Sequence, residues 1–88
     1  MNLLIVDDEY LVVEEVVTVT DWELLGITEI YSATNAVSAV RILNEKKIDI
    51  MICDIEMPQT DGLELSKKAK ENFPDLEIVM LTSHAEFN

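Results

Sequence analysis

The stretch MICDIEMPQTDG, residues 51–62, carries most of the information about the fold. Its apolar start, together with Ile50, has the length and side chains of a strand that is buried on both faces of a parallel sheet. The strand ends on the carboxylate of Asp54, and Met57-Pro58 and Asp61-Gly62 follow as turn-forming pairs. A carboxylate directly at the end of a buried strand indicates a polar site at that edge of the sheet.

Outward from this stretch, strands and helices alternate along the chain. Strands are predicted at 3–6, 29–33, 48–53 and 77–81, and helices at 9–20, 36–44 and 63–72. The β-branched content of 9–20 suggests a strand, but its length and Glu14-Glu15 favour a helix. The alternation predicts an α/β fold with a parallel sheet, helices on both faces and right-handed crossovers. In such sheets ligands bind beyond the carboxyl ends of the strands.

Length and composition restrict the class of protein. The chain has 88 residues, which is enough for one domain, and its apolar fraction of 49% is sufficient for a packed core. The net charge is −12, from 18 acids and 6 bases. This charge argues against nucleic acid or an anionic membrane as a direct partner and suits a basic or cation-bearing partner, although solubility alone also accounts for it.

Single reactive side chains offer little chemistry of their own. Cys53 is the one cysteine, so no disulfide forms within the chain and no zinc cluster is possible; we interpret it as a small buried hydrophobe. His84 is the one histidine and is interpreted as a loop residue. The apolar run 3–6 is too short for a signal peptide or a membrane span, so we expect a cytoplasmic protein.

Acids follow two of the predicted strands. Asp7 and Asp8 come after the first strand, Asp54 after the third, and Thr82 after the fourth. If the first and third strands are neighbours, three carboxylates converge and repel one another unless a cation binds. Oxygen ligands without His or Cys favour Mg²⁺ or Mn²⁺ over Zn²⁺. A carboxylate beside such a metal can attack a phosphoryl group. Each acid taken alone is better explained as a solvated strand cap, and only the set together favours a metal site.

Three segments together resemble a known family. LIVDDE at 4–9, DIEMPQTDG at 54–62 and IVMLTSHAEF at 78–87 resemble the receiver domain of two-component response regulators, in register over essentially the whole chain. DWELLGI at 21–27 and LTSHAEF at 81–87 further resemble receivers attached to AraC-type DNA-binding output domains. The resemblance implies a flavodoxin-like sheet, similar to that of the chemotaxis receiver. It also implies the strand order 2-1-3-4, with strand five and the last helices missing.

The resemblance also implies roles for individual residues. Asp54 matches the phosphoacceptor, Asp8 the carboxylate that binds Mg²⁺ directly, and Asp7 the carboxylate that reaches it through water. Glu56 matches the residue whose backbone carbonyl binds the metal. Thr82 matches the switch hydroxyl, and Pro58 and Gly62 match the loop that shapes the pocket.

By the same resemblance, the expected function is signalling. A sensor histidine kinase donates a phosphoryl group to Asp54 with Mg²⁺, and the phosphorylated domain controls a DNA-binding output domain and thereby transcription. The chain is expected to be no enzyme beyond self-phosphorylation and self-dephosphorylation. Residues 1–88 are expected to be an incomplete receiver without its output domain. The family's lysine of strand five has no counterpart here, so Mg²⁺ binding is expected to survive while phosphorylation is slow or fails to switch the fold.

Two alternatives stay open from the sequence. The first is a receiver-like dimerisation or interaction module that is not competent for phosphorylation in this truncated form; strand 77–81 would be an exposed apolar edge, so self-association through it is expected. The second is a phosphatase of the haloacid dehalogenase type, which needs a second carboxylate two residues after its Asp nucleophile. Glu56 stands at that offset, but Met57-Pro58 follows and the acids at 7–8 have no place in that scheme.

Overall fold

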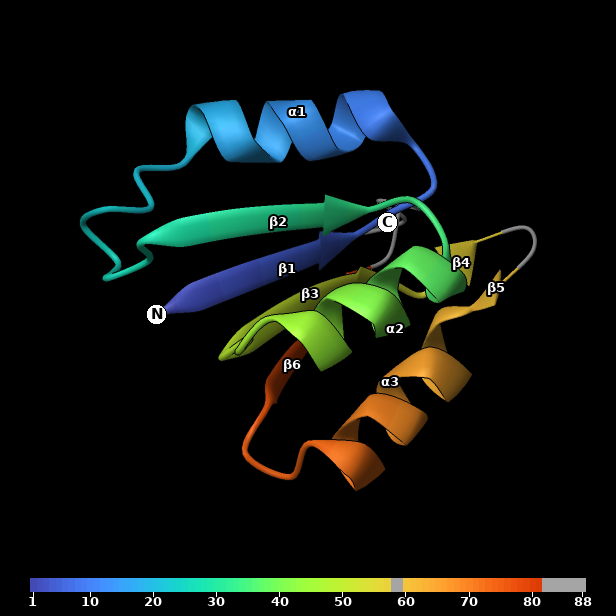
Figure 1. Cartoon of the computed structure of the whole chain (residues 1–88). Coiled ribbons are helices and arrows are strands. Elements are labelled where there is room, and N and C mark those ends of the chain that lie inside the picture. Colours follow the sequence, from blue (N-terminus) through green and yellow to red (C-terminus); the bar gives the residue numbers. More distant parts are fainter. Residues whose placement is uncertain (58–59, 82–88) are drawn as a thin grey trace, which may run out of the picture.

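The computed structural model describes residues 1–57 and 60–81, and these form a sheet flanked by helices (Figure 1). The elements follow in the order β1 (Asn2–Val6), α1 (Tyr10–Val19), β2 (Glu29–Ala33), α2 (Ala36–Glu45), β3 (Ile50–Asp54), β4 (Glu56–Met57), β5 (Thr60–Asp61), α3 (Gly62–Asn72) and β6 (Glu77–Leu81). The main sheet has the strand order β2-β1-β3-β6, and all of its pairs are parallel. The predicted α/β class and the order 2-1-3-4 are therefore confirmed.

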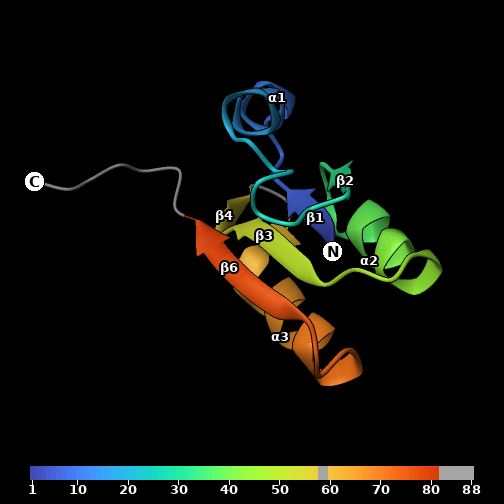
Figure 2. The same cartoon turned by 90° about the vertical axis from the view of Figure 1, so that its left-hand side faces the viewer.

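The sheet separates two apolar layers. Alternate residues of β1 point to opposite faces, so Leu3 and Ile5 pack with Val13 of α1, whereas Leu4 and Val6 pack on the other side. On that other side, Leu43 of α2 and residues of α3 complete the larger core. Figure 2 shows the same division, with α1 on one face of the sheet and α2 and α3 on the other.

The helices begin and end where the local sequence indicates. Asn35 caps α2, because its side chain accepts a hydrogen bond from the Ser38 amide at 2.8 Å. Helix α1 is confirmed in spite of its valines, but Val13 is its one buried residue because α1 contacts the sheet along a narrow stripe. After α1, the indole N–H of Trp22 donates to the carbonyl of Val17 at 3.1 Å, which ties the following turn to the helix.

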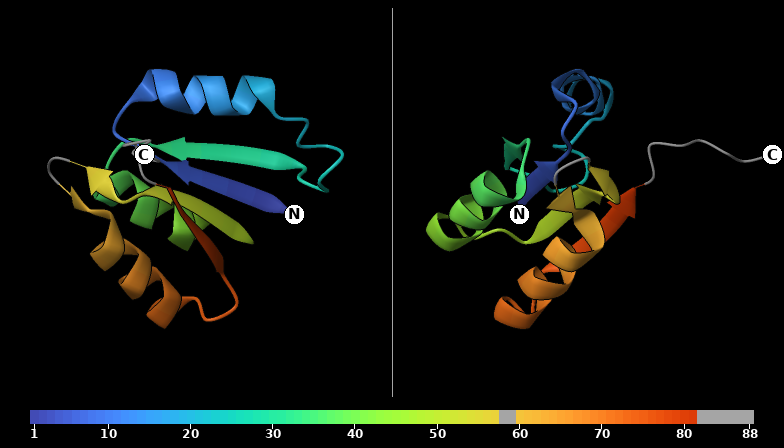
Figure 3. Two further views of the ribbon diagram at one scale, coloured as in Figure 1. Left: turned by 180° about the vertical axis from the view of Figure 1, so that it is seen from behind. Right: turned by 90° about the vertical axis from the view of Figure 1, so that its right-hand side faces the viewer.

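Three details differ from the sequence prediction. Strand β3 runs from Ile50 to Asp54 rather than over 48–53, and Asp49 before it accepts a side-chain hydrogen bond from the Asn2 amide at 2.8 Å. The stretch after Asp54, predicted as a loop, contains the antiparallel pair β4–β5 (Figure 3), which lies at the carboxyl end of the strands. Val40 lies four residues after Ala36 and three before Leu43, a spacing that predicts a core position, but it is 45% exposed.

Strand β6 is at one edge of the sheet. It pairs with β3 on one side, and no strand of the described residues pairs with its other side. Its side chains are partly or fully exposed along its length, including Val79 and Leu81. Among the described residues, no helix combines the length and the apolar character that crossing a membrane requires.

Candidate functional site

The three acids singled out by the sequence lie together at the carboxyl edge of the sheet. Strands β1 and β3 are neighbours in register, with Val6 opposite Cys53, so Asp7 and Asp54 follow at the same level. One carboxylate oxygen from each of Asp7, Asp8 and Asp54 lies within 4.8 Å of the others. The expected convergence of the acids is therefore present.

Backbone hydrogen bonds hold these positions. The Asp7 amide donates to the Ala33 carbonyl at 3.1 Å, which continues the pairing of β1 with β2 by one residue. On the other strand, the Ile55 amide donates to the Leu81 carbonyl at 2.9 Å, directly after Asp54. The backbone at Asp7 and next to Asp54 is therefore fixed by hydrogen bonds to neighbouring strands of the sheet.

The acids differ in exposure. Asp7 and Asp54 are buried, whereas Asp8 is exposed at the mouth of the cluster. The Asp7 carboxylate accepts a hydrogen bond from the Glu9 amide at 2.9 Å, which is an Asx turn that also fixes the start of α1. The cluster therefore has two buried oxygen donors and one that is open to solvent.

Electrostatics at the cluster are unfavourable without a counter-charge. Burial raises the pKa of Asp7, the negative charges of Asp54 and Asp8 raise it further, and the hydrogen bond from the Glu9 amide opposes them. A divalent cation placed among the three carboxylates would remove this repulsion. Three carboxylate donors without nitrogen or sulfur suit Mg²⁺ or another hard cation, and they leave coordination positions for water or phosphate oxygens. The residues present therefore fit a magnesium site.

Gly62 is required beside the cluster for a steric reason. It is buried at the start of α3, and a Cβ atom built on it would overlap the carbonyl oxygen of Asp54. The same Cβ would lie 3.1 Å from the carbonyl carbon of Asp54 and 3.1 Å from the Cα of Ile55. Only glycine permits α3 to begin this close to the backbone of Asp54.

Beside Asp54, the small side chain of Cys53 is buried next to that of Ser66. Cys53 is buried, its thiol lies 3.5 Å from the Asp54 carbonyl oxygen, and burial raises the pKa of the thiol. Ser66 is buried in α3 and its hydroxyl donates to the Met80 sulfur at 3.0 Å. The expectation of a buried, unreactive Cys53 agrees with these contacts.

The remaining predicted residues are placed in part. Glu56 begins β4 two residues after Asp54, opposite Asp61 in the short hairpin. Pro58, Thr82 and His84 lie outside the described residues. The amide of Glu9 and the hydroxyl of Ser66 were not predicted. An aspartate two residues before the N-cap residue of a helix is a sequence signal for the first of these contacts, whereas nothing local indicates the second.

Comparison with known proteins identifies relatives over almost the whole chain. The family model described as response regulator receiver domain matches residues 3–88. The transcriptional regulatory protein YesN of Bacillus subtilis is 34% identical over 86 residues, which cover 98% of this chain and 23% of YesN. The response regulator UvrY of Escherichia coli is 31% identical over 86 residues, covering 98% of this chain and 39% of UvrY. The chain thus spans less than half the length of these curated relatives.

Solved structures agree with the sequence relatives. A two-component transcriptional regulator AraC from Clostridium phytofermentans superposes with a TM-score of 0.90 and 25% identity, covering 99% of this chain and 70% of that one. The response regulator protein TrrA from Thermotoga maritima, in complex with Mg²⁺ and BeF, gives a TM-score of 0.81 and 30% identity, with coverage of 99% and 73%.

Proposed function

Because the chain belongs to the response regulator receiver domain family, we propose that it takes a phosphoryl group from a sensor histidine kinase onto Asp54, with Mg²⁺. The observation that carries the proposal is the cluster of Asp7, Asp8 and Asp54 at the carboxyl edge of the sheet. A buried carboxylate in such a cluster can act as a nucleophile toward phosphorus when the surrounding charge is balanced.

The metal ligands in this proposal are Asp8, Asp54 and the backbone carbonyl of Glu56, with Asp7 holding a metal-bound water. When bound, Mg²⁺ neutralises charge on the phosphoryl oxygens. The carboxylate of Asp8 is exposed to solvent, and buried Asp7 is held by the Glu9 amide. The chain's own contribution is therefore a fixed arrangement of oxygens, which supports positioning as its main role.

The proposed transfer is an in-line substitution at phosphorus. A carboxylate oxygen of Asp54 attacks the phosphorus of a phosphohistidine in line with the P–N bond. A P–O bond forms, the P–N bond breaks, and its electron pair stays on the imidazole nitrogen, which takes up a proton. The product is an acyl phosphate on Asp54, and water later hydrolyses it. We propose Thr82 as the hydroxyl that then donates to a phosphoryl oxygen.

Receiver domains are in general signalling phosphoacceptors, and the curated relatives are transcriptional regulators. We extend this to the present chain: its chemistry is limited to taking up and losing its own phosphoryl group, in the cytoplasm, where the kinase domain resides. The consequence is control of an attached DNA-binding domain. Direct binding of nucleic acid by this segment is disfavoured, since its charge of −12 repels phosphate.

The test uses acetyl phosphate as donor and intact mass as readout. With Mg²⁺, the chain gains the mass of one phosphoryl group; with excess EDTA it does not. Asp54→Asn abolishes the gain, and Asp75→Asn, an exposed acid far along the chain, serves as the matched control and retains it. Addition that persists in Asp54→Asn or in EDTA would exclude the proposed site.

A second candidate function is self-association through the edge strand. Strand β6 presents backbone groups on its outer edge and carries exposed Val79 and Leu81, which favours pairing with a strand of another chain. We propose that the 88-residue chain associates in this way. Val79→Lys places a charge on the edge and should lower the association constant, measured by sedimentation equilibrium; unchanged association in this variant contradicts the candidate.

A further inference from the structure

Charge is distributed unevenly over the two faces of the molecule. The first 40 residues contain no Lys, Arg or His, and their acids are Asp7, Asp8, Glu9, Glu14, Glu15, Asp21, Glu23 and Glu29. All 6 bases lie in 41–70: Arg41, Lys46, Lys47, Lys67, Lys68 and Lys70. They belong to α2, to the connection after it and to α3, which cover the face of the sheet opposite α1 (Figure 2).

The acidic side carries an apolar protrusion. We call residues 21–26 the leucine turn. In it, Leu24 is 83% exposed and Leu25 is 59% exposed, and the acids Asp21 and Glu23 beside them are exposed as well. Two adjacent leucines in water lose the free energy that burial would give them. An exposed apolar group with charged neighbours, here the acids Asp21 and Glu23 and the N-terminal ammonium of Met1, is typical of a contact surface.

The leucine turn is held rigidly rather than loosely. The Leu25 amide donates to the Trp22 carbonyl at 3.0 Å, and the Ile27 amide donates to the same carbonyl at 2.9 Å. Trp22 is itself bonded to α1, and Ile27 is buried in the core. The N-terminal ammonium of Met1 donates to the Gly26 carbonyl at 2.9 Å, and Gly26 adopts φ +81°. The leucines are therefore presented outward by a fixed backbone, which lowers the entropy cost of docking them.

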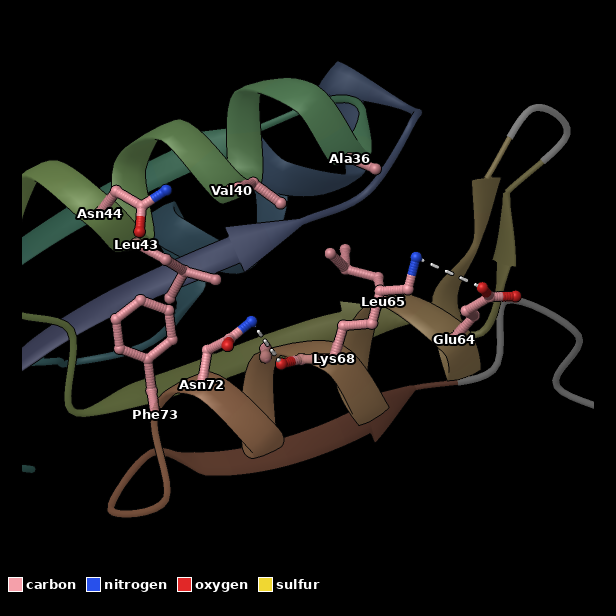
Figure 4. Close-up of a pocket in the computed structure, with 10 residues that line it drawn as sticks. Ala36, Val40, Leu43, Asn44, Glu64, Leu65, Lys68, Asn72 and Phe73 are labelled. Atoms are coloured by element: carbon pink, nitrogen blue, oxygen red, sulfur yellow. Dashed lines mark hydrogen bonds and ion pairs between the residues drawn. The ribbon is translucent and has the colours of Figure 1, made fainter.

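A groove of complementary character lies between α2 and α3 on the opposite face. It encloses about 320 Å³, and Figure 4 shows Val40, Leu43, Leu65 and Phe73 around it. Ala36 and Ala69 complete the apolar lining, and Asn44, Glu64, Lys68 and Asn72 form the polar part. The volume lies at the lower end of the range of protein ligand sites.

The groove continues toward the lysines that follow α2. An adjoining hollow shares Leu43, Asn72 and Phe73 with it and adds Lys46 and Lys47, together with the acids Asp49 and Asp75. At the other end, Lys68 pairs with Glu64 at 3.5 Å. The apolar groove is thus bordered at one end by Lys46 and Lys47, next to Asp49 and Asp75, and at the other end by the ion pair of Lys68 with Glu64.

We propose that the groove between α2 and α3 accepts the leucine turn of a second copy of this chain. Leu24 and Leu25 would enter the apolar lining, and Asp21 and Glu23 would face Lys46, Lys47 or Lys68. The turn and the groove lie on opposite faces of the sheet, so one chain cannot fill its own groove (Figure 1). The contact joins two different surfaces and is therefore heterologous, unlike pairing of two identical strand edges.

The experiment separates the two halves of the contact. Sedimentation equilibrium is run on the wild-type chain, on the turn variant Leu24→Ser/Leu25→Ser and on the groove variant Val40→Glu. Each variant should weaken self-association at least about tenfold, because one buried leucine or one buried charge is worth that much. Mixing the two variants should restore a one-to-one complex, since each supplies the surface that the other lacks.

Matched controls carry the same type of substitution, Leu to Ser or Val to Glu, at exposed positions outside the contact. Leu11 of α1 is 76% exposed, so Leu11→Ser controls for the turn variant. Val37 of α2 is 81% exposed and does not line the groove, whereas Val40 is 45% exposed and does, so Val37→Glu controls for the groove variant. Both controls should associate like the wild type. Circular dichroism checks that every variant is folded.

The outcomes decide the proposal. A wild-type chain that stays monomeric at its highest soluble concentration would overturn the proposal. Turn and groove variants that associate like the wild type would also overturn it, and loss of association in Val79→Lys alone would assign the contact to β6. Folded variants that do not recombine when mixed would show that the two surfaces are not partners.

Discussion

Replacing Gly62 by Ala should destabilise the protein, against the usual effect of this substitution in a helix. Alanine is favoured over glycine in a helix by about 1 kcal/mol, so helix propensity alone predicts a gain. Here the added Cβ would overlap the Asp54 carbonyl oxygen and lie 3.1 Å from two more backbone atoms. None of the three belongs to a flexible side chain, so relief requires movement of β3 or α3.

The magnitude follows from that geometry. Overpacking of a core costs about 1–3 kcal/mol even when side chains can adjust. Because backbone must move here, we expect a net loss of at least about 2 kcal/mol after the helix preference is included. Asp54 would move with the strand, so the affinity for Mg²⁺ should fall as well.

Gly26→Ala is the matched control. Gly26 has φ +81° and nothing lies within 4 Å of the position that a Cβ would take, so this substitution destabilises the protein through backbone strain alone. That strain costs roughly 1–2 kcal/mol and leaves the acidic cluster untouched. Comparing the two variants therefore separates a steric clash at Asp54 from the general cost of losing a glycine.

Urea unfolding, followed by the fluorescence of the single tryptophan, Trp22, measures both variants, and calorimetric titration measures Mg²⁺ binding. Gly62→Ala should lower the midpoint more than Gly26→Ala at an unchanged slope, and it alone should weaken Mg²⁺ binding. A midpoint for Gly62→Ala equal to or above that of the wild type would refute the close approach of α3 to Asp54.

Three further predictions concern other parts of the structure. Asp7→Asn should raise the unfolding temperature at neutral pH without metal. The raised pKa of Asp7 means that the folded state binds its proton more tightly than the unfolded state. This acid therefore lowers stability as pH rises above its ordinary pKa of 3.8, and the gain from the substitution should vanish at lower pH. Mg²⁺ should raise the unfolding temperature of the wild type, measured by scanning calorimetry, and Asp8→Asn should remove most of that shift. Asn35→Ala should lower the free energy of unfolding in urea by about 1 kcal/mol, because α2 loses its cap. Glu9→Ala should lower it less, because the Glu9 side chain makes no cap bond to α1.

Strand positions were predictable because a short apolar run between polar residues is typical of a strand, whether it is buried like β1 or lies at the edge like β6. The apolar runs of β1 and of β6 predict these strands to within one residue at each end. The meeting of Asp7, Asp8 and Asp54 was also predictable, since parallel neighbours end at the same edge. The sequence argument assumed only that β1 and β3 are neighbours, and the two strands do pair in the sheet.

Features that depend on distant partners were not predictable. The hairpin of β4 and β5 has two residues on each strand, too few for any period to appear in the sequence. Val40 has the spacing of a core residue, and its exposure arises because α2 and α3 leave a groove between them. A helical period identifies the apolar face of a helix, but the separation of two helices decides how much of that face is covered.

Helix α1 connects the exposed leucines to the acidic cluster. Helix α1 begins directly after Asp7 and Asp8, and the leucine turn follows its far end, bonded to it through Trp22. A change in charge at the cluster acts on the Glu9 amide, which Asp7 holds, and so on the first turn of α1. Val13 is buried in α1, and Val16 and Val17 pack partly buried against the same core cluster, so α1 and the turn form one connected unit. Binding of Mg²⁺ or addition of a phosphoryl group at Asp54 therefore acts on the leucine turn through the hydrogen bonds of Glu9 and Trp22. The association proposed through that turn should then depend on the state of the cluster, so its constant should differ between Mg²⁺ and EDTA.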